Sequence, residues 1–227
     1  MTTSGRTLLA PGEIPTASAS PAEPAAQRAY DETKRRIIRG DIAGGTWLSE
    51  VVVCQELGLS RTPVHEAFLR LAAEELLSLE ARKGALVRAL SPSEVTDVVE
   101  MREAIESTAA RRAIANADAG LDAALASLLE QQQRCSDSGD VDGFVDADDA
   151  FHSAVVAASQ NGIATQFTNS LRDRAQRVRH QAMRLRPSDL AAALDDHRRL
   201  AAAVAARDAD AYSAVLNEHV RMLLGAR

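Results

Sequence analysis

One aspartate and three histidines have the residue types and helical surroundings of a metal site. Asp148 and His152 are four residues apart, so on a helix their side chains share a face, and valines on that face predict that it points inward. His197 and His219 each lie among apolar residues at helical spacing. A carboxylate and three imidazoles inside a helical bundle suit a divalent transition metal ion. Spacing alone leaves open that each histidine is a separately hydrogen-bonded side chain.

Two further polar residues in the same half of the chain need an interpretation. Arg102 is in line with apolar positions on an earlier predicted helix, and an inward arginine can hold a carboxylate through two parallel hydrogen bonds. The alternative is a surface ion pair with Glu106, one helical turn further on. His180 lies in an arginine-rich run over residues 172–186, which predicts a solvent-exposed face and not a ligand position.

The elements that must position these residues are six predicted helices. They are expected near residues 92–116, 121–137, 141–159, 163–186, 188–206 and 208–224, with Gly, Ser, Asn or Pro in most of the breaks. Ser91, Pro92 and Glu94 form a helix-start signal of a capping residue, a proline in the first turn and an early glutamate. No sequence period repeats, so the pattern predicts a bundle and not a solenoid.

A helix-turn-helix is predicted ahead of this bundle. Gly58 suits the left-handed position that ends one helix, and Ser60 or Thr62 can cap the next, with Pro63 in its first turn. The residues expected on the buried face of this second helix are Val64, Ala67, Phe68 and Leu71.

The outer face of the second helix carries polar and basic side chains, which contacts with base edges and phosphates require. A basic hairpin tip follows, around Lys83 and Gly84, and suits a wing that touches phosphates or the minor groove. The candidate DNA-contacting residues are Arg61, Thr62, His65, Arg70, Lys83 and Gly84. Taken alone, an amphipathic helical hairpin and a solvated turn account for the same patterns.

Residues from about 27 to 90 resemble the winged-helix domain of the GntR family of bacterial transcription regulators. The run SRTPVHEAF, residues 60–68, is similar to the family's SRTPVREAL core. His65 and Val51 stand where the family commonly has arginines that reach DNA, so base preference is expected to differ. The fold is expected to be unaffected, because both positions face outward.

Residues 92–224 resemble the FCD effector-binding domain that follows many GntR winged helices, in its shorter, six-helix, VanR-like form. The matching residues are 101–106, Asp148, Phe151, His152, Asn161, Gly162, His197 and His219. The resemblance implies that Asp148, His152, His197 and His219 hold a divalent metal ion. Three imidazoles and a carboxylate suit zinc, nickel, iron or manganese. The resemblance also implies that Arg102 helps to bind a small organic acid beside that ion.

The charge is divided unevenly along the chain. Residues 27–90 carry ten Lys and Arg against nine Asp and Glu, whereas residues 91–227 carry fifteen against twenty-one. DNA affinity must therefore depend on where single basic side chains lie, and should be sensitive to salt. Cys54 and Cys135 are predicted to be free core thiols in a reducing cytosol, and we find neither a membrane-spanning run nor a secretory signal.

These features predict a mostly α-helical regulator: a disordered tail (1–26), a winged helix-turn-helix DNA-binding domain (27–90) and an all-α six-helix FCD domain (91–227). We expect a cytoplasmic homodimer that binds a pseudo-palindromic double-stranded DNA operator. A small carboxylate metabolite beside the metal would control operator affinity, and repression relieved by effector is the commoner family behaviour. Two alternatives stay open: a metal-dependent helical enzyme, although no motif supplies an additional base or nucleophile, and a repressor that senses the metal itself.

Overall fold

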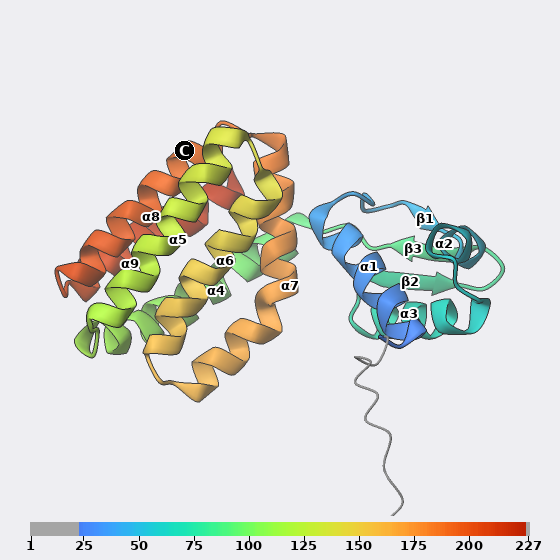
Figure 1. Ribbon diagram of the computed structural model, residues 1–227, viewed down its shortest axis with the longest axis horizontal. Helices are drawn as coiled ribbons and strands as arrows, with labels where there is room; N and C mark the ends of the chain where they lie inside the picture. Colours follow the sequence, from blue (N-terminus) through green and yellow to red (C-terminus); the bar gives the residue numbers. More distant parts are fainter. Residues whose placement is uncertain (1–22, 226–227) are drawn as a thin grey trace, which may run out of the picture.

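The computed structural model describes residues 23–225, which form a small N-terminal unit and a larger helical bundle side by side (Figure 1). Most of the tail expected over residues 1–26 lies outside this range. Helix α1 begins at Ala25, so residues 25 and 26, the last two of the expected tail, are helical. No helix within residues 23–225 combines the length and apolar character needed to cross a bilayer.

The N-terminal unit is a winged helix-turn-helix. Its elements are α1 (Ala25–Arg39), β1 (Trp47–Leu48), α2 (Glu50–Leu57), α3 (Arg61–Ala73), β2 (Leu77–Glu80) and β3 (Gly84–Val87). The strands form an antiparallel sheet in the order β1-β3-β2, in which β2 and β3 are the predicted hairpin. The four residues expected on the buried face of α3 are all at most 1% exposed, which confirms that prediction.

Two glycines fix the turns of this unit. Gly58 ends α2 at φ +64°, and its N–H donates to the carbonyl oxygen of Cys54. Gly84 begins β3 at φ +106°, and a Cβ there would lie 2.6 Å from the carbonyl oxygen of Leu48. A residue with a side chain at position 84 would therefore push β1 away from the wing.

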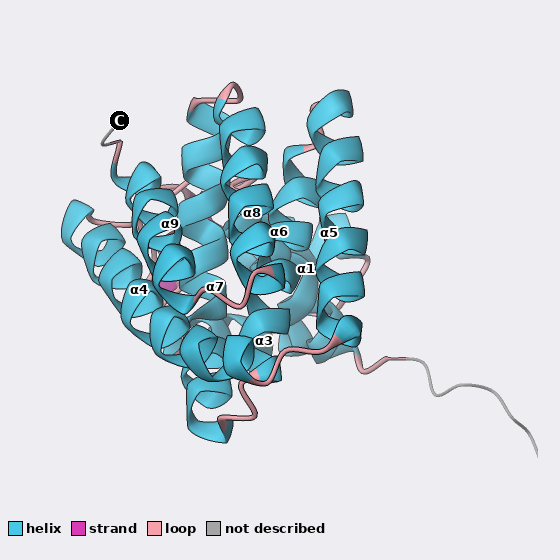
Figure 2. Cartoon of the chain, turned by 90° about the vertical axis from the view of Figure 1, so that its left-hand side faces the viewer, coloured by secondary structure: helices cyan, strands magenta, loops and turns pink. Residues whose placement is uncertain are grey.

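The C-terminal unit is an all-α bundle (Figure 2). In the described part of the chain its helices are α4 (Pro92–Ala115), α5 (Ala119–Ser138), α6 (Val141–Ala158), α7 (Gly162–Leu185), α8 (Asp189–Ala205) and α9 (Ala209–Arg221), followed by a 3-10 turn, Met222–Leu224. The six predicted ranges agree with these ends to within three residues. Helix α4 starts with a full capping box, since Ser91 Oγ accepts from the Glu94 N–H and the Glu94 carboxylate from the Ser91 N–H. Cys135 is buried and Cys54 partly buried, and both are free.

The two units meet where α1 packs against α7, and several ion pairs join the units around this contact. These ion pairs are Lys34–Asp173 (2.6 Å), Arg39–Asp142 (3.5 Å), Arg39–Asp146 (3.2 Å), Arg174–Glu75 (3.0 Å) and Arg184–Asp41 (3.3 Å). Polar contacts of this kind are typical of interfaces between domains that move relative to each other. The arginine-rich run on α7 is thus part of the surface that contacts the winged-helix unit.

His180 lies at this junction, so the expectation that it is solvated is wrong. Its side chain is 1% exposed, and its Nδ1 lies 3.3 Å from Oδ1 of Asp142 on α6. The error arose because the arginines around it are engaged with α1 and α6 and do not mark a free surface. Burial, together with the nearby arginines, lowers the pKa of His180 to about 4.

We expect His180 to make the protein less stable as the pH falls from about 6.5 to about 4. In the unfolded chain histidine takes up a proton near its ordinary pKa of about 6.5, whereas folded His180 does so only near 4. Its contribution is therefore fully present above pH 6.5 and is lost below it. Between pH 7 and pH 4.5, the melting temperature of the variant His180→Gln, measured by circular dichroism, should fall less than that of the parent. Equal losses in both proteins would contradict this role.

Candidate metal centre and nucleic-acid interface

Asp148, His152, His197 and His219 lie together at the centre of the bundle. Helix α6 supplies Asp148 and His152 one turn apart, α8 supplies His197 and α9 supplies His219. None of the four is more than 2% exposed. One potential ligand atom from each residue lies within 4.8 Å of the others, as a metal site requires.

The three imidazoles point their Nε2 atoms at one another. The Nε2–Nε2 distances are 3.2 Å for His152–His197, 3.3 Å for His152–His219 and 3.2 Å for His197–His219. Oδ1 of Asp148 lies 3.3 Å from Nε2 of His197 and 3.9 Å from Nε2 of His219. Nitrogens at about 2.1 Å from one ion are about 3.4 Å apart in tetrahedral and about 3.0 Å apart in octahedral geometry. The observed nitrogen spacing therefore fits a single ion between the rings.

Hydrogen bonding fixes which nitrogen of His197 carries the proton. The Gln132 amide nitrogen donates to the carbonyl oxygen of Ala147 (3.3 Å), so the amide oxygen Oε1 faces His197. Nδ1 of His197 lies 2.6 Å from that oxygen, which can only accept. Nδ1 is therefore protonated, and Nε2 presents a lone pair to the other two rings.

The other two rings have carboxylates behind them. Nδ1 of His152 lies 2.8 Å from Oε2 of Glu106, and Nδ1 of His219 lies 3.7 Å from Oδ2 of Asp196. Acceptors on the outer nitrogen are what orient metal-binding histidines and make their inner nitrogen more basic. His197 thus has a hydrogen-bond acceptor on its outer nitrogen, His152 has a carboxylate oxygen at 2.8 Å, and the carboxylate behind His219 lies beyond hydrogen-bond distance.

The electrostatics of the cluster favour a cation at its centre. Burial lowers the pKa of His197 to about 3, and burial also lowers the pKa of His219, so both rings are neutral at pH 7. The imidazole nitrogens and the Asp148 carboxylate then converge on one point, and His197 and His219 bring no positive charge to it. A divalent cation at that point would replace this repulsion with attraction, and the donor set fits such an ion.

Arg102 lies beside this centre and is already paired. Its Nε donates to Oε1 of Glu106 over 2.8 Å, and the two side chains are 3% and 5% exposed. The ion pair considered as the alternative is therefore present, but it is buried and not at the surface. Nη1 and Nη2 of Arg102 have no hydrogen-bond partner among the residues that the structure describes, so two donors remain for another group.

A small cavity adjoins Arg102 and His152. Its volume is about 20 Å³, enough for about one water molecule. Arg179 lines it and holds the neighbouring carboxylate, since its Nε lies 2.8 Å from Oδ2 of Asp148. The hydroxyl of Thr168, in the same wall, lacks a hydrogen-bond partner within the described chain. Most residues that line the cavity are polar or charged, but it is too small for an organic acid in this conformation.

The residues that support the four candidate ligands were mostly missed in the sequence. In the sequence, Glu106 was considered only as a partner for Arg102. Gln132, Arg179 and Asp196 were not singled out. Asp196 directly precedes His197 but faces His219 on another helix, so chain proximity gives no signal for the pairing. Such contacts depend on how the helices pack.

A groove between α3 and the wing gathers most of the candidate DNA contacts. It is lined by Arg61, His65, Lys83 and Gly84, among others. Thr62 is exposed at the start of α3, outside the lining of the groove. Arg70 lies apart from them, with its guanidinium 3.8 Å from the centre of the Tyr30 ring and a hydrogen bond to Gln27. The groove has the basic and polar side chains that DNA requires.

Glu50, at the start of α2, contacts two of the side chains that line this groove, Arg61 and His65. Its carboxylate lies 3.0 Å from Nε of Arg61 and 2.6 Å from Nδ1 of His65, and these contacts, led by the one with His65, lower the pKa of Glu50. A DNA phosphate that reaches Arg61 or His65 must therefore compete with an internal carboxylate.

Two family models match the chain, "Bacterial regulatory proteins, gntR family" over residues 25–87 and "FCD domain" over residues 97–222. The HTH-type transcriptional repressor RspR of Escherichia coli (strain K12) is 30% identical over 203 residues, 89% of this chain and 88% of that protein. The gluconate operon transcriptional repressor of Bacillus subtilis (strain 168) is 29% identical over 181 residues, 78% of this chain and 74% of that protein.

Solved structures share the fold over most of the chain. E. coli McbR/YncC superposes with a TM-score of 0.74 at 23% identity, covering 88% of this chain and 95% of that one. A GntR regulator from Rhodococcus sp. RHA1 gives a TM-score of 0.71 at 24% identity, covering 89% and 98%. The gntR family model describes regulatory proteins, and the two relatives are named as transcriptional repressors, which rules against the enzyme alternative. The chain belongs to the GntR family of bacterial transcription regulators, with an FCD domain behind its winged helix.

Proposed function

We propose that this protein is a cytoplasmic, homodimeric repressor whose affinity for a pseudo-palindromic operator is controlled by a metal-dependent site in the FCD domain. The observation that carries the proposal is the convergence of three Nε2 atoms and the Asp148 carboxylate on one point. The relatives named as repressors support the direction of the effect. Twofold symmetry would let two winged helices meet successive major grooves.

Asp148, His152, His197 and His219 are the proposed ligands of one divalent transition metal ion. Three imidazoles and a carboxylate suit zinc, nickel, iron and manganese, so cellular supply contributes to the choice. The ion would supply a positive charge that attracts the carboxylate of an organic acid. The side chains behind the ligands hold the rings in the orientation and tautomer that binding needs.

Arg102 is the proposed partner of that organic acid, through its two unpaired nitrogens. Because the adjoining cavity holds only about 20 Å³, an acid can enter only if its walls move. One wall belongs to α7, which also carries Arg174 and Arg184 at the junction with the DNA-binding unit. A shift of α7 would therefore change how the winged helix is held, and linkage requires the operator to alter acid affinity equally.

The small cavity also favours a second function, a repressor in which the metal is itself the signal. Arg102 is already paired with Glu106, and the space beside it suits a water better than a metabolite. In that case the ion alone would set the placement of α7.

The test first identifies the operator by sequencing the genomic DNA that the purified protein retains. Operator affinity is then measured with metal removed or restored, each with and without a panel of small organic acids. An acid effect that needs metal supports the proposed function, and a metal effect without any acid supports the second one. If neither state binds DNA sequence-selectively, both functions are refuted.

We expect Arg61→Ala to weaken operator binding about tenfold or more and to leave the metal content unchanged. Arg61 is 81% exposed on the outer face of α3, where a basic side chain can reach base edges or phosphates. Gel shifts at two salt concentrations measure the loss. Arg134→Ala, an exposed arginine on α5, is the matched control and should bind like the parent. If Arg61→Ala binds the operator with unchanged affinity, Arg61 does not contribute to the DNA interface.

A further inference from the structure

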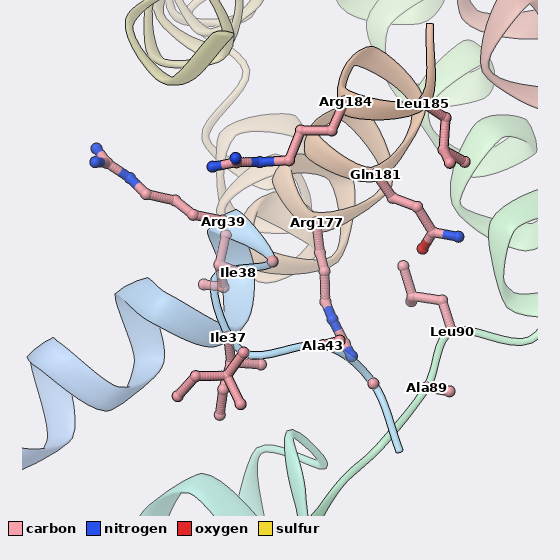
Figure 3. A pocket seen from close by; sticks show the side chains of 13 residues that line it. Ile37, Ile38, Arg39, Ala43, Ala89, Leu90, Arg177, Gln181, Arg184 and Leu185 are labelled. Atoms are coloured by element: carbon pink, nitrogen blue, oxygen red, sulfur yellow. The ribbon is translucent and has the colours of Figure 1, made fainter. Parts of the chain in front are cut away.

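A second cavity lies at the junction of the two units, away from the centre of the bundle (Figure 3). Its volume is about 340 Å³, within the range of about 300–1,000 Å³ that small-molecule sites occupy. One side comes from α1 and the loop after it, and the other comes from α7 and the segment that leads into α4. A molecule bound there would contact both units at once.

The walls of this junction cavity are mainly apolar. Ile37, Ile38 and Ile42 line it from the winged-helix side, and Leu90 and Leu185 from the other. Leu185 is 74% exposed at the edge of the cavity. An aliphatic or aromatic group in the cavity would cover this apolar surface.

Among the described residues that line the junction cavity, Arg177 is the one cation that forms no ion pair. Arg39 and Arg184 also line the cavity, but each forms ion pairs with aspartates. Arg177 donates to the backbone carbonyl of Arg88, and no carboxylate oxygen of the described residues lies within ion-pair distance of it. Burial lowers the pKa of Arg177, although the charge of Glu94 acts in the opposite direction.

The positions of the side chains are complementary to an anion with an apolar tail. In Figure 3, Arg177 and Gln181 extend from α7 toward the loop with Ala43 and the segment with Leu90, whereas Arg184 turns toward Arg39. We propose that the junction cavity binds a small amphipathic monocarboxylate, whose carboxylate pairs with Arg177 and Gln181 and whose chain packs on the isoleucines. This site is separate from Arg102 and the metal ligands, and its occupancy would bind the winged helix to α7.

The probe is octanoate, titrated into the full-length protein by isothermal titration calorimetry, with 1-octanol and acetate as comparisons. We expect saturable binding of octanoate, at least tenfold weaker binding of the alcohol, which lacks the charge, and none of acetate, which lacks the chain. Arg177→Met should weaken octanoate binding at least tenfold, and Ala43→Phe, which fills the cavity, should abolish it.

Two control variants separate the junction cavity from the other arginines that could attract a carboxylate. Arg174→Met removes another junction arginine that does not line the cavity, and the double variant Arg102→Met with Glu106→Leu removes the arginine of the bundle centre together with its buried partner. Both should bind octanoate like the parent. The proposal is overturned if octanoate does not bind saturably, if 1-octanol binds as tightly, if Arg177→Met or Ala43→Phe binds like the parent, or if the double variant alone abolishes binding.

Discussion

The variant His197→Ala should retain less than about one-tenth of the parent's metal content and should melt on the order of 10 °C lower. The substitution deletes one of three converging Nε2 atoms, and the oxygen of Gln132 loses its donor. It also opens a void beside Phe151, whose ring centre is 5.0 Å from that of His197. Cavity and lost hydrogen bond together cost about 2–5 kcal/mol before any contribution from the metal.

Elemental analysis after dialysis against zinc, nickel or manganese measures the metal, and calorimetry measures the melting temperature. His180→Ala is the matched control, because it removes an equally buried histidine that is outside the cluster. That control should be destabilised but should keep its metal. A full complement of metal in His197→Ala would exclude His197 as a ligand, and with it the proposed site.

The variant Glu106→Ala should lower the free energy of unfolding by about 3–5 kcal/mol, because it leaves the buried charge of Arg102 uncompensated. Although burial raises the pKa of Glu106, Arg102 and His152 outweigh it, so the pKa lies below its ordinary value and the group is ionised at pH 7. Glu106 is also the acceptor behind His152, so metal affinity should fall about 10- to 100-fold.

A double variant separates these two roles of Glu106. Arg102→Met with Glu106→Leu replaces the ion pair by apolar groups and should recover most of the stability in urea unfolding. It should not recover the metal affinity, because His152 still lacks its acceptor. Glu100→Ala, at an exposed position on α4, should change the unfolding free energy by less than about 0.5 kcal/mol. If Glu106→Ala is as stable as Glu100→Ala, the buried pair does not stabilise the fold.

Much of the architecture could be predicted from local sequence. The helices of the bundle were predicted because their apolar periods are long and the breaks between them carry residues such as Gly139, Asn161 and Pro187. The hairpin of the wing was predicted from alternation around Lys83 and Gly84. Strand β1 was not predicted, because two residues are too few to show alternation and the strand forms only by pairing with β3.

The candidate site was predictable only in part, for a physical reason. Its four proposed ligands each carry a local signal, a polar side chain on an apolar helical face. The partners behind them depend on contacts between helices, such as Gln132 of α5 with His197 of α8. His180 was misassigned for the same reason, since a run of arginines looks alike in sequence whether it faces water or another domain.

The ion pairs between the two units affect how operator binding will respond to added electrolyte. Every side chain in these ion pairs is at least 20% exposed, so dissolved ions weaken the pairs together with the contacts to phosphate. The slope of log affinity against log salt will thus differ from the count of neutralised phosphates. A steeper slope would mean that DNA binds the arrangement in which the two units are in contact. A shallower slope would mean that this contact keeps the winged helices from binding DNA.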